Sequence, residues 1–206
     1  MSTPTEGPRE AVISPHGAPS PAEPAERRAA GERGGGVFWG LLRIGIGWLF
    51  LWPFLDRLFA LGFSTGRNPE TGVVDRFGDA AWINGGSPTE GFLSNGLHTK
   101  EPFEGFYSGL AGQAWVDWVY MVSMAAIGLA LILGIATRAA ALAGVAWMVL
   151  FYTAAAVWPE HNPLIDDRVI EAVALAGIAF VGAGRYLGLG RRWERSALVR
   201  RYPVLR

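Results

Sequence analysis

The chain has 206 residues and contains no cysteine. Without a thiol it forms no disulfide bond, supplies no thiolate to an iron–sulfur cluster, attaches no c-type haem and carries no persulfide.

Charge is also scarce. Charged residues make up 17% of the chain, against roughly a quarter in soluble domains. Half of the residues are hydrophobic, and mean hydropathy is positive. The length allows a single domain.

Large apolar residues are few in residues 1–36, which are rich in Pro, Gly, Glu and Arg. Such a segment buries too little surface to offset the entropy of ordering the chain. We therefore predict a disordered tail over residues 1–36. Its length and its mixture of acids and bases are unlike the n-region of a signal peptide.

Four apolar runs follow the tail, at 37–61, 118–137, 139–158 and 169–189. At about 1.5 Å per residue, each is long enough to cross a hydrocarbon core of roughly 30 Å as a helix. We predict an all-α fold, a four-helix transmembrane bundle over residues 37–189. Arg138 marks the expected tight turn between the second and third helices, and Ala126, Ala130 and Gly134 give a small-residue face for helix packing.

A long polar segment, residues 63–114, separates the first two runs. Ser87-Pro88-Thr89-Glu90 is a capping-box pattern with proline at the first helical position, so it predicts a short helix that begins at Pro88. We expect this long loop to lie on the membrane surface, partly as a lid over the bundle.

The distribution of Lys and Arg predicts the orientation. The tail, the turn at Arg138 and the C-terminal segment together hold 12 of these residues, whereas the two opposite loops hold 4. Under the positive-inside rule both termini are cytoplasmic, and the loop 63–114 is extracytoplasmic. We place the protein in the cell (plasma) membrane as a multi-pass protein, with residues 190–206 as a basic cytoplasmic tail at the lipid interface.

Four segments carry a resemblance to a known family: Leu42-Arg43-Ile44-Gly45, Leu55-Asp56-Arg57-Leu58, the loop sequence at 82–89 and Trp158-Pro159-Glu160-His161-Asn162-Pro163. With these segments the chain resembles the DoxX/DoxD family of four-helix membrane proteins, over about residues 37–206. The family includes the membrane subunit of thiosulfate:quinone oxidoreductase. The resemblance implies an oxidoreductase subunit that passes electrons from thiosulfate, or a related small donor, to quinone.

Three charged residues of the first run are candidates for binding quinone or an anionic donor. Arg43 and Arg57 are fourteen residues apart, which places them on roughly one helix face, and Asp56 points away from it. Arg43 could instead extend to the inner headgroups or hold a carbonyl of a neighbouring helix. Asp56 and Arg57 could instead form an ion pair that positions the helix end.

Asp167, Arg168 and Glu171 open the last run, at spacings that let the three side chains meet. Two neighbouring carboxylates in a poorly hydrated place favour proton transfer, which quinone reduction needs. Glu171, Asp167 and His161 are therefore candidate catalytic residues, and Arg168 a candidate binding residue. The alternative is an ordinary helix start, with Asp166 as N-cap and Arg168 paired with Glu171.

We expect neither a metal site nor a haem. His161 is the one histidine of the acidic segment, and a transition metal needs several ligands in a fixed geometry. His98 and His161 both lie outside the predicted transmembrane helices, so they do not bracket a bilayer-embedded haem. The basic residues lie at the inner membrane face, which gives no indication of nucleic acid.

Three functions remain open at this point. In the first, quinone is the electron acceptor, the lipid bilayer is the surroundings, and a soluble or membrane redox partner supplies what this chain lacks. The second is a non-catalytic membrane scaffold that anchors soluble redox proteins. The third is a small-solute carrier, which would need polar groups deeper in the bundle than the sequence provides.

Overall fold

The computed structural model describes residues 22–98, 103–155 and 165–202. Over these residues the chain is helical and has no strand, although Arg67 and Val74 form one isolated β-bridge. The chain divides into two compact units, residues 1–35 and 36–206. All-helical structure is thus confirmed for the part of the chain that is described.

Helix α1 (Ala22–Phe59) begins earlier than the sequence predicts. Residues 22–36 are helical, whereas composition places them in a disordered tail; residues 1–21 lie outside the described part. The difference has a local cause, because Ala, Glu and Arg are strong helix formers even where no apolar surface is buried. The helix also continues through Pro53.

Three helices of the described residues are long and apolar enough to cross a membrane. They are Gly34–Phe59 of α1, α4 (Ala114–Leu133) and α5 (Thr137–Ala155). The fourth expected helix is shorter, because α6 (Asp167–Val181) has 15 residues and ends at Gly182 in the left-handed conformation. The 3₁₀ turn η2 (Ala183–Arg185) follows.

The turn between α4 and α5 lies earlier than predicted. Gly134 adopts φ 73° and ends α4, and Ala136 adopts φ 45° just before α5 begins. Gly134 allows this because a left-handed φ costs glycine nothing sterically. Arg138 consequently belongs to the first turn of α5 rather than to the loop.

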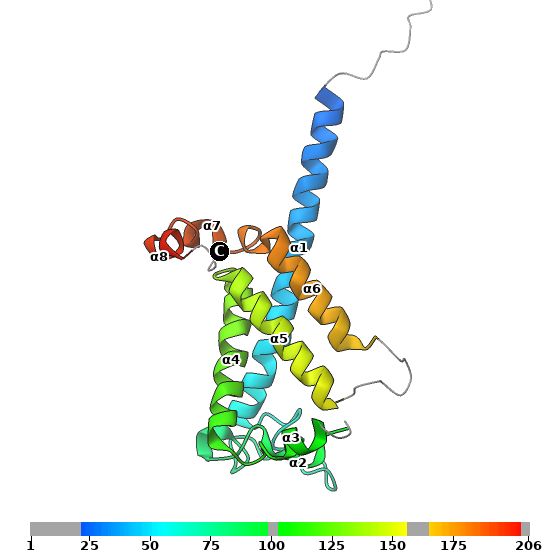
Figure 1. Cartoon of the computed structure of the whole chain (residues 1–206), viewed down its shortest axis with the longest axis vertical. Coiled ribbons are helices and arrows are strands. Elements are labelled where there is room, and N and C mark those ends of the chain that lie inside the picture. The colour runs from blue at the N-terminus through cyan, green and yellow to red at the C-terminus, as the bar shows by residue number, and fades with distance from the viewer. Residues whose placement is uncertain (1–21, 99–102, 156–164, 203–206) are drawn as a thin grey trace, which may run out of the picture. The chain divides into compact units, whose positions relative to one another are not determined.

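One buried core joins α1, α4, α5 and α6 in the second unit (Figure 1). Its least exposed members include Phe50 of α1, Met121 and Leu131 of α4, and Leu175 and Ile178 of α6. Large apolar side chains on the outward faces remain exposed, among them Phe180 of α6 at 85%. Exposed apolar helix faces around an apolar core are typical of a lipid environment rather than water.

Helices α1 and α4 approach each other at glycines that the predicted small-residue face does not include. A methyl group on Gly128 would come within 2.8 Å of the backbone nitrogen of Leu51, and one on Gly47 within 3.0 Å of that of Ile132. Ala126, by contrast, is exposed. The two glycines, one on each helix, let the backbones of α1 and α4 pack directly.

Short helices lie at both ends of the core helices (Figure 1). The turn η1 (Trp82–Asn84) precedes α2 (Glu90–Asn95) and α3 (Phe103–Ser108), which lie at one end. The other end carries α7 (Gly190–Trp193) and α8 (Ala197–Arg201). Helix α2 begins at Glu90 rather than at Pro88, and Ser87 Oγ accepts the Glu90 amide at 3.2 Å, so half of the predicted capping box is formed.

Candidate functional site

A cavity of about 440 Å³ lies among α1, α2, α3, α4, α5 and α6. Its wall is mainly apolar and rich in aromatic rings. The aromatic lining residues are Phe50, Phe92, Phe106, Tyr107, Trp115, Tyr120, Trp147 and Phe151. The cavity opens to the surface, because four of the residues that line it are also exposed: Leu49, Trp115, Val119 and Leu150.

Three charged side chains line the cavity: Arg57 of α1 with Arg168 and Glu171 of α6. They come from opposite ends of the sequence, and the core helices bring them to one place. A mainly apolar cavity with a few converging polar groups is the usual form of a small-molecule site.

Arg57 is held in position by three neighbours. Its Nε donates to the carbonyl oxygen of Pro88 at 3.0 Å, and its Nη1 donates to Ser64 Oγ at 3.3 Å. Its guanidinium carbon lies 5.2 Å from the centre of the Tyr120 ring, which is cation–π distance. Nη2 has no hydrogen-bond partner among the described residues, so Arg57 retains a donor for a ligand.

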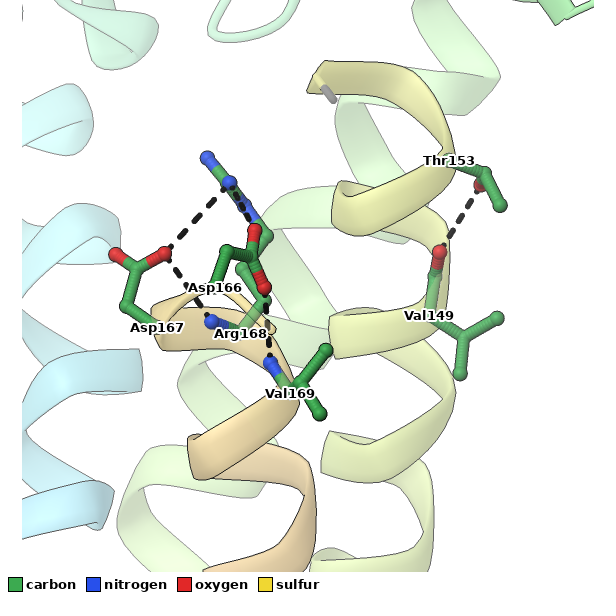
Figure 2. Close-up of polar contacts among 6 residues, drawn as sticks. All are labelled: Val149, Thr153, Asp166, Asp167, Arg168 and Val169. Atoms are coloured by element: carbon green, nitrogen blue, oxygen red, sulfur yellow. Dashed lines mark hydrogen bonds and ion pairs between the residues drawn. The ribbon is translucent and has the colours of Figure 1, made fainter. Parts of the chain in front are cut away.

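The guanidinium of Arg168 pairs with two acidic residues at the start of α6. Figure 2 shows its guanidinium between two carboxylates, with Nη1 2.8 Å from Asp166 Oδ2 and 3.7 Å from Asp167 Oδ1. Asp166 is the N-cap of α6, because its Oδ1 accepts the amide of Val169 at 3.0 Å. The predicted N-cap is therefore confirmed, but the guanidinium of Arg168 pairs with these aspartates and not with Glu171.

Glu171 is the carboxylate that the cavity leaves free. It is half-buried, lines the cavity, and has no hydrogen bond or ion pair with any described residue. Asp167, in contrast, does not line the cavity, and its side chain is 79% exposed. Glu171 is thus the one predicted acid that is placed to meet a ligand in the cavity.

Asp56 supports the loop rather than the cavity. It is buried, and its carboxylate accepts the amide of Phe63 at 3.1 Å, the amide of Ser64 at 2.8 Å and the Ser64 hydroxyl at 2.6 Å. It is absent from the cavity wall. These bonds fix the chain as it leaves α1, through loop donors rather than through the Asp56–Arg57 ion pair that the sequence suggested as the alternative.

Arg43 lies away from the cavity and does not reach outward to headgroups. Its side chain is fully buried, and its Nη1 donates to the carbonyl oxygens of Leu131 and Ile132, the latter at 3.2 Å. Its Nη2 donates to those of Tyr186 at 3.2 Å and Leu187 at 3.1 Å. Arg43 therefore satisfies carbonyl groups where α4 and η2 end, as in the carbonyl-holding alternative.

The prediction for His161 stays untested, because His161 lies outside the described residues. His98 is exposed, with Nδ1 3.0 Å from the carbonyl oxygen of Gly96, and does not line the cavity. No group of three or more His, Cys, Asp or Glu that could hold a metal ion occurs in the described ranges.

Two further residues belong to the site region. Tyr120 is buried in α4 and lies beneath the guanidinium of Arg57. Asp117, one turn earlier, is buried and accepts from Ser87 and Thr89, so it fastens the loop to α4. An acid in the first turn of an otherwise apolar helix was a signal for Asp117, whereas nothing in the sequence distinguishes Tyr120.

The fold and the cavity together define a class: a helical protein, with three helices able to cross a membrane and an aromatic cavity among them. Comparison with models of known families, with curated proteins and with solved structures finds no match to the chain.

Proposed function

We propose that this chain is an integral membrane protein that binds the head of a quinone in its cavity and serves as a subunit of a membrane redox complex. The observation that carries the proposal is the aromatic cavity, with Arg57 and Glu171 presenting a free donor and a free carboxylate in one apolar space. A quinone head is a flat conjugated ring that can stack on aromatic side chains, and its carbonyl oxygens accept hydrogen bonds.

The membrane topology is part of the proposal. Helix α6 completes a four-helix bundle in the plasma membrane, and its exposed Ile170, Val173 and Phe180 face lipid. With 12 Lys and Arg on one side and 4 on the other, both termini are cytoplasmic and the loop 63–114 is outside. The cavity then lies toward the outer leaflet, where a lipophilic quinone enters from the bilayer.

In the proposed reaction, quinone takes up two electrons and two protons and becomes quinol. The donor is an anion such as thiosulfate: two thiosulfates that join through a new sulfur–sulfur bond to form tetrathionate release the two electrons. Arg57 donates a hydrogen bond to a quinone carbonyl oxygen, which gains negative charge as electrons arrive. Glu171, as the protonated acid, passes one proton to that oxygen and is reprotonated from water, and the second proton reaches the other quinone oxygen from water.

The resemblance to the DoxX/DoxD family supports this assignment. The lack of cysteine agrees with a shared complex, because covalent sulfur chemistry would take place on a partner subunit.

Quinone binding is the direct test. Trp115 and Trp147 line the cavity, so a short-chain ubiquinone titrated into the purified full-length protein should quench tryptophan fluorescence saturably. Arg57→Ala should weaken binding by about tenfold, the effect of losing one hydrogen bond to a charged donor. Arg67→Ala is the matched control, because Arg67 is exposed in the same loop region and does not line the cavity. Non-saturable quenching, or equal loss in both variants, would contradict the proposal.

A non-catalytic scaffold is the second candidate function. It is favoured because three of the candidate residues bond within the protein. Arg43 donates to backbone carbonyl oxygens, Asp56 accepts from backbone amides, and Arg168 pairs with a neighbouring carboxylate. A protein that binds no quinone but co-purifies with soluble oxidoreductases would favour it.

A further inference from the structure

A second, small cleft lies where α5 begins, away from the aromatic cavity. Its volume is about 50 Å³, enough for a few waters at roughly 10–15 Å³ each, or for one tetrahedral oxyanion. Its lining residues include Gly134, Thr137, Gly184 and Gly190 and three charged side chains. The cleft shares no lining residue with the aromatic cavity.

Thr137 supplies an unused hydroxyl in this cleft. The residue is 3% exposed, and its Oγ1 has no hydrogen-bond partner among the described residues. A buried hydroxyl without a hydrogen-bond partner is destabilising, which favours a ligand or a water at this place. A side chain on Gly184 would collide with Oγ1, so the glycine keeps the space beside the hydroxyl clear.

The backbone adds further donors. Helix α5 has 19 residues, and at its start the Ala140 amide donates to the Ala136 carbonyl oxygen at 3.0 Å. The amides of Thr137, Arg138 and Ala139 precede that bond and lack an intrahelical acceptor, as at any helix start. The first turn also carries the positive end of the helix dipole, which favours an anion.

The charged side chains that line the cleft carry a net positive charge. Arg138 is exposed and has no hydrogen bond or ion pair with a described residue. Arg185 Nε donates to Glu194 Oε1 at 2.8 Å, which neutralises Glu194 and leaves the other Arg185 nitrogens unused in that bond. Arg138 therefore adds to the cleft of Thr137 a positive charge that no described residue pairs with.

We infer that this cleft binds a phosphate group through the Thr137 hydroxyl, the first amides of α5 and the guanidinium of Arg138. The size excludes a nucleotide or a sugar phosphate held entirely within it. A phospholipid headgroup and free inorganic phosphate share this chemistry. In the proposed orientation the cleft faces the cytoplasmic headgroups, and anionic lipid is the expected source.

The experiment measures binding to the delipidated full-length protein in two arms. One arm counts phosphatidylglycerol bound against phosphatidylcholine by native mass spectrometry, and the other follows the melting temperature with inorganic phosphate against chloride at equal ionic strength. Arg138→Gln and Thr137→Val should each weaken binding about five- to tenfold. Thr137→Ser should retain it, and Glu194→Gln should strengthen it by removing the one negative side chain in the cleft wall.

Arg200→Gln is the charge-matched control, because Arg200 is exposed and does not line the cleft. Binding in the phosphatidylglycerol arm identifies a headgroup, and binding in the phosphate arm alone identifies the free ion. No preference in either arm, or unchanged binding in both Arg138→Gln and Thr137→Val, would overturn the inference. Equal weakening by Arg200→Gln would also overturn it, since net charge alone would then explain the effect.

Discussion

Asp117 of α4 accepts two hydrogen bonds from Thr89 of the loop, from the hydroxyl at 2.7 Å and from the backbone amide at 3.1 Å. Both donors meet Oδ1 of the carboxylate, and Ser87 Oγ donates to the same oxygen at 3.0 Å. A buried carboxylate with three donors is a stable clamp. It fixes the segment before α2, which supplies Pro88 to Arg57 and part of the cavity wall.

We predict that Asp117→Ala loosens this segment. The Thr89 amide is buried and would lose its acceptor, at a cost of about 1–3 kcal/mol. Hydrogen exchange of the amides in residues 87–95 should accelerate, whereas exchange in α5 should change little. Asp117→Asn retains a carbonyl oxygen and should have a smaller effect, and Asp79→Ala is an exposed control. Equal exchange in Asp117→Ala and wild type would show that the clamp contributes nothing.

The contact between α1 and α4 predicts whether alanine in place of Gly128 stabilises or destabilises the protein. Alanine is the better helix former by about 0.8–1 kcal/mol, so Gly128→Ala would stabilise an isolated helix. In the folded protein the added methyl group would approach the Leu51 nitrogen to 2.8 Å, and backbone cannot move aside cheaply. We therefore expect Gly128→Ala to destabilise the protein by about 1–3 kcal/mol, the usual cost of overpacking.

The matched change is Ala126→Leu, two residues earlier on the same helix but exposed. It should leave the melting temperature in detergent nearly unchanged, while Gly128→Ala lowers it. The opposite order would mean that α4 packs through the face of Ala126, Ala130 and Gly134 that the sequence alone suggested.

Substitutions of Arg43 are predicted to lower the stability of the protein but to leave quinone binding in the cavity unchanged. Arg43→Met keeps the aliphatic length but leaves the carbonyl oxygens of Leu131, Ile132, Tyr186 and Leu187 without their donor. Several unsatisfied acceptors at about 1–3 kcal/mol each should lower the melting temperature strongly.

Arg43→Lys restores a charge but lacks the fork that reaches both carbonyl pairs, so it should recover stability only in part. Quinone affinity of the fraction that remains folded should equal that of wild type. If these Arg43 variants keep their stability but bind quinone more weakly, Arg43 contributes to the binding site after all.

The sequence was sufficient for the helices and for several local features. Continuous apolar length predicted the segments that became α1, α4 and α5, and Asp166 was correctly predicted as an N-cap because the signal lies within one turn of the chain. Ends were less accurate: the turn at Gly134 was missed because Ile135 and Ala136 continue the apolar run. The helical content of residues 22–36 was missed because composition reports burial, not local propensity.

The roles of the charged residues could not be read from spacing. The spacing of Arg43 and Arg57 predicted a shared face of α1, but only Arg57 lines the cavity. The carbonyl groups that Arg43 satisfies belong to residues 88 to 144 positions later, and no local pattern indicates them. In the same way, Arg168 lies within reach of Glu171 on the helix, but Asp166 and Asp167 compete for it at the helix start.

Glu171 provides the final prediction, which depends on the proposed function. If its carboxyl group, in the protonated form, passes a proton to the bound quinone, Glu171→Gln should slow quinol formation by about 10²–10⁴-fold and leave quinone affinity within about threefold. The amide has nearly the same size and still accepts a hydrogen bond, so the cavity keeps its shape. Stopped-flow absorbance of quinone in the assembled redox complex measures the rate, and fluorescence quenching measures affinity.

Glu104→Gln is the matched control, because Glu104 is exposed on α3 and does not line the cavity. Arg57→Ala should show the complementary pattern, with weaker quinone affinity as the main effect. If Glu171→Gln reduces quinone at the wild-type rate, the proton reaches the ligand by another route, and the free carboxylate in the cavity is only a polar group near the start of α6.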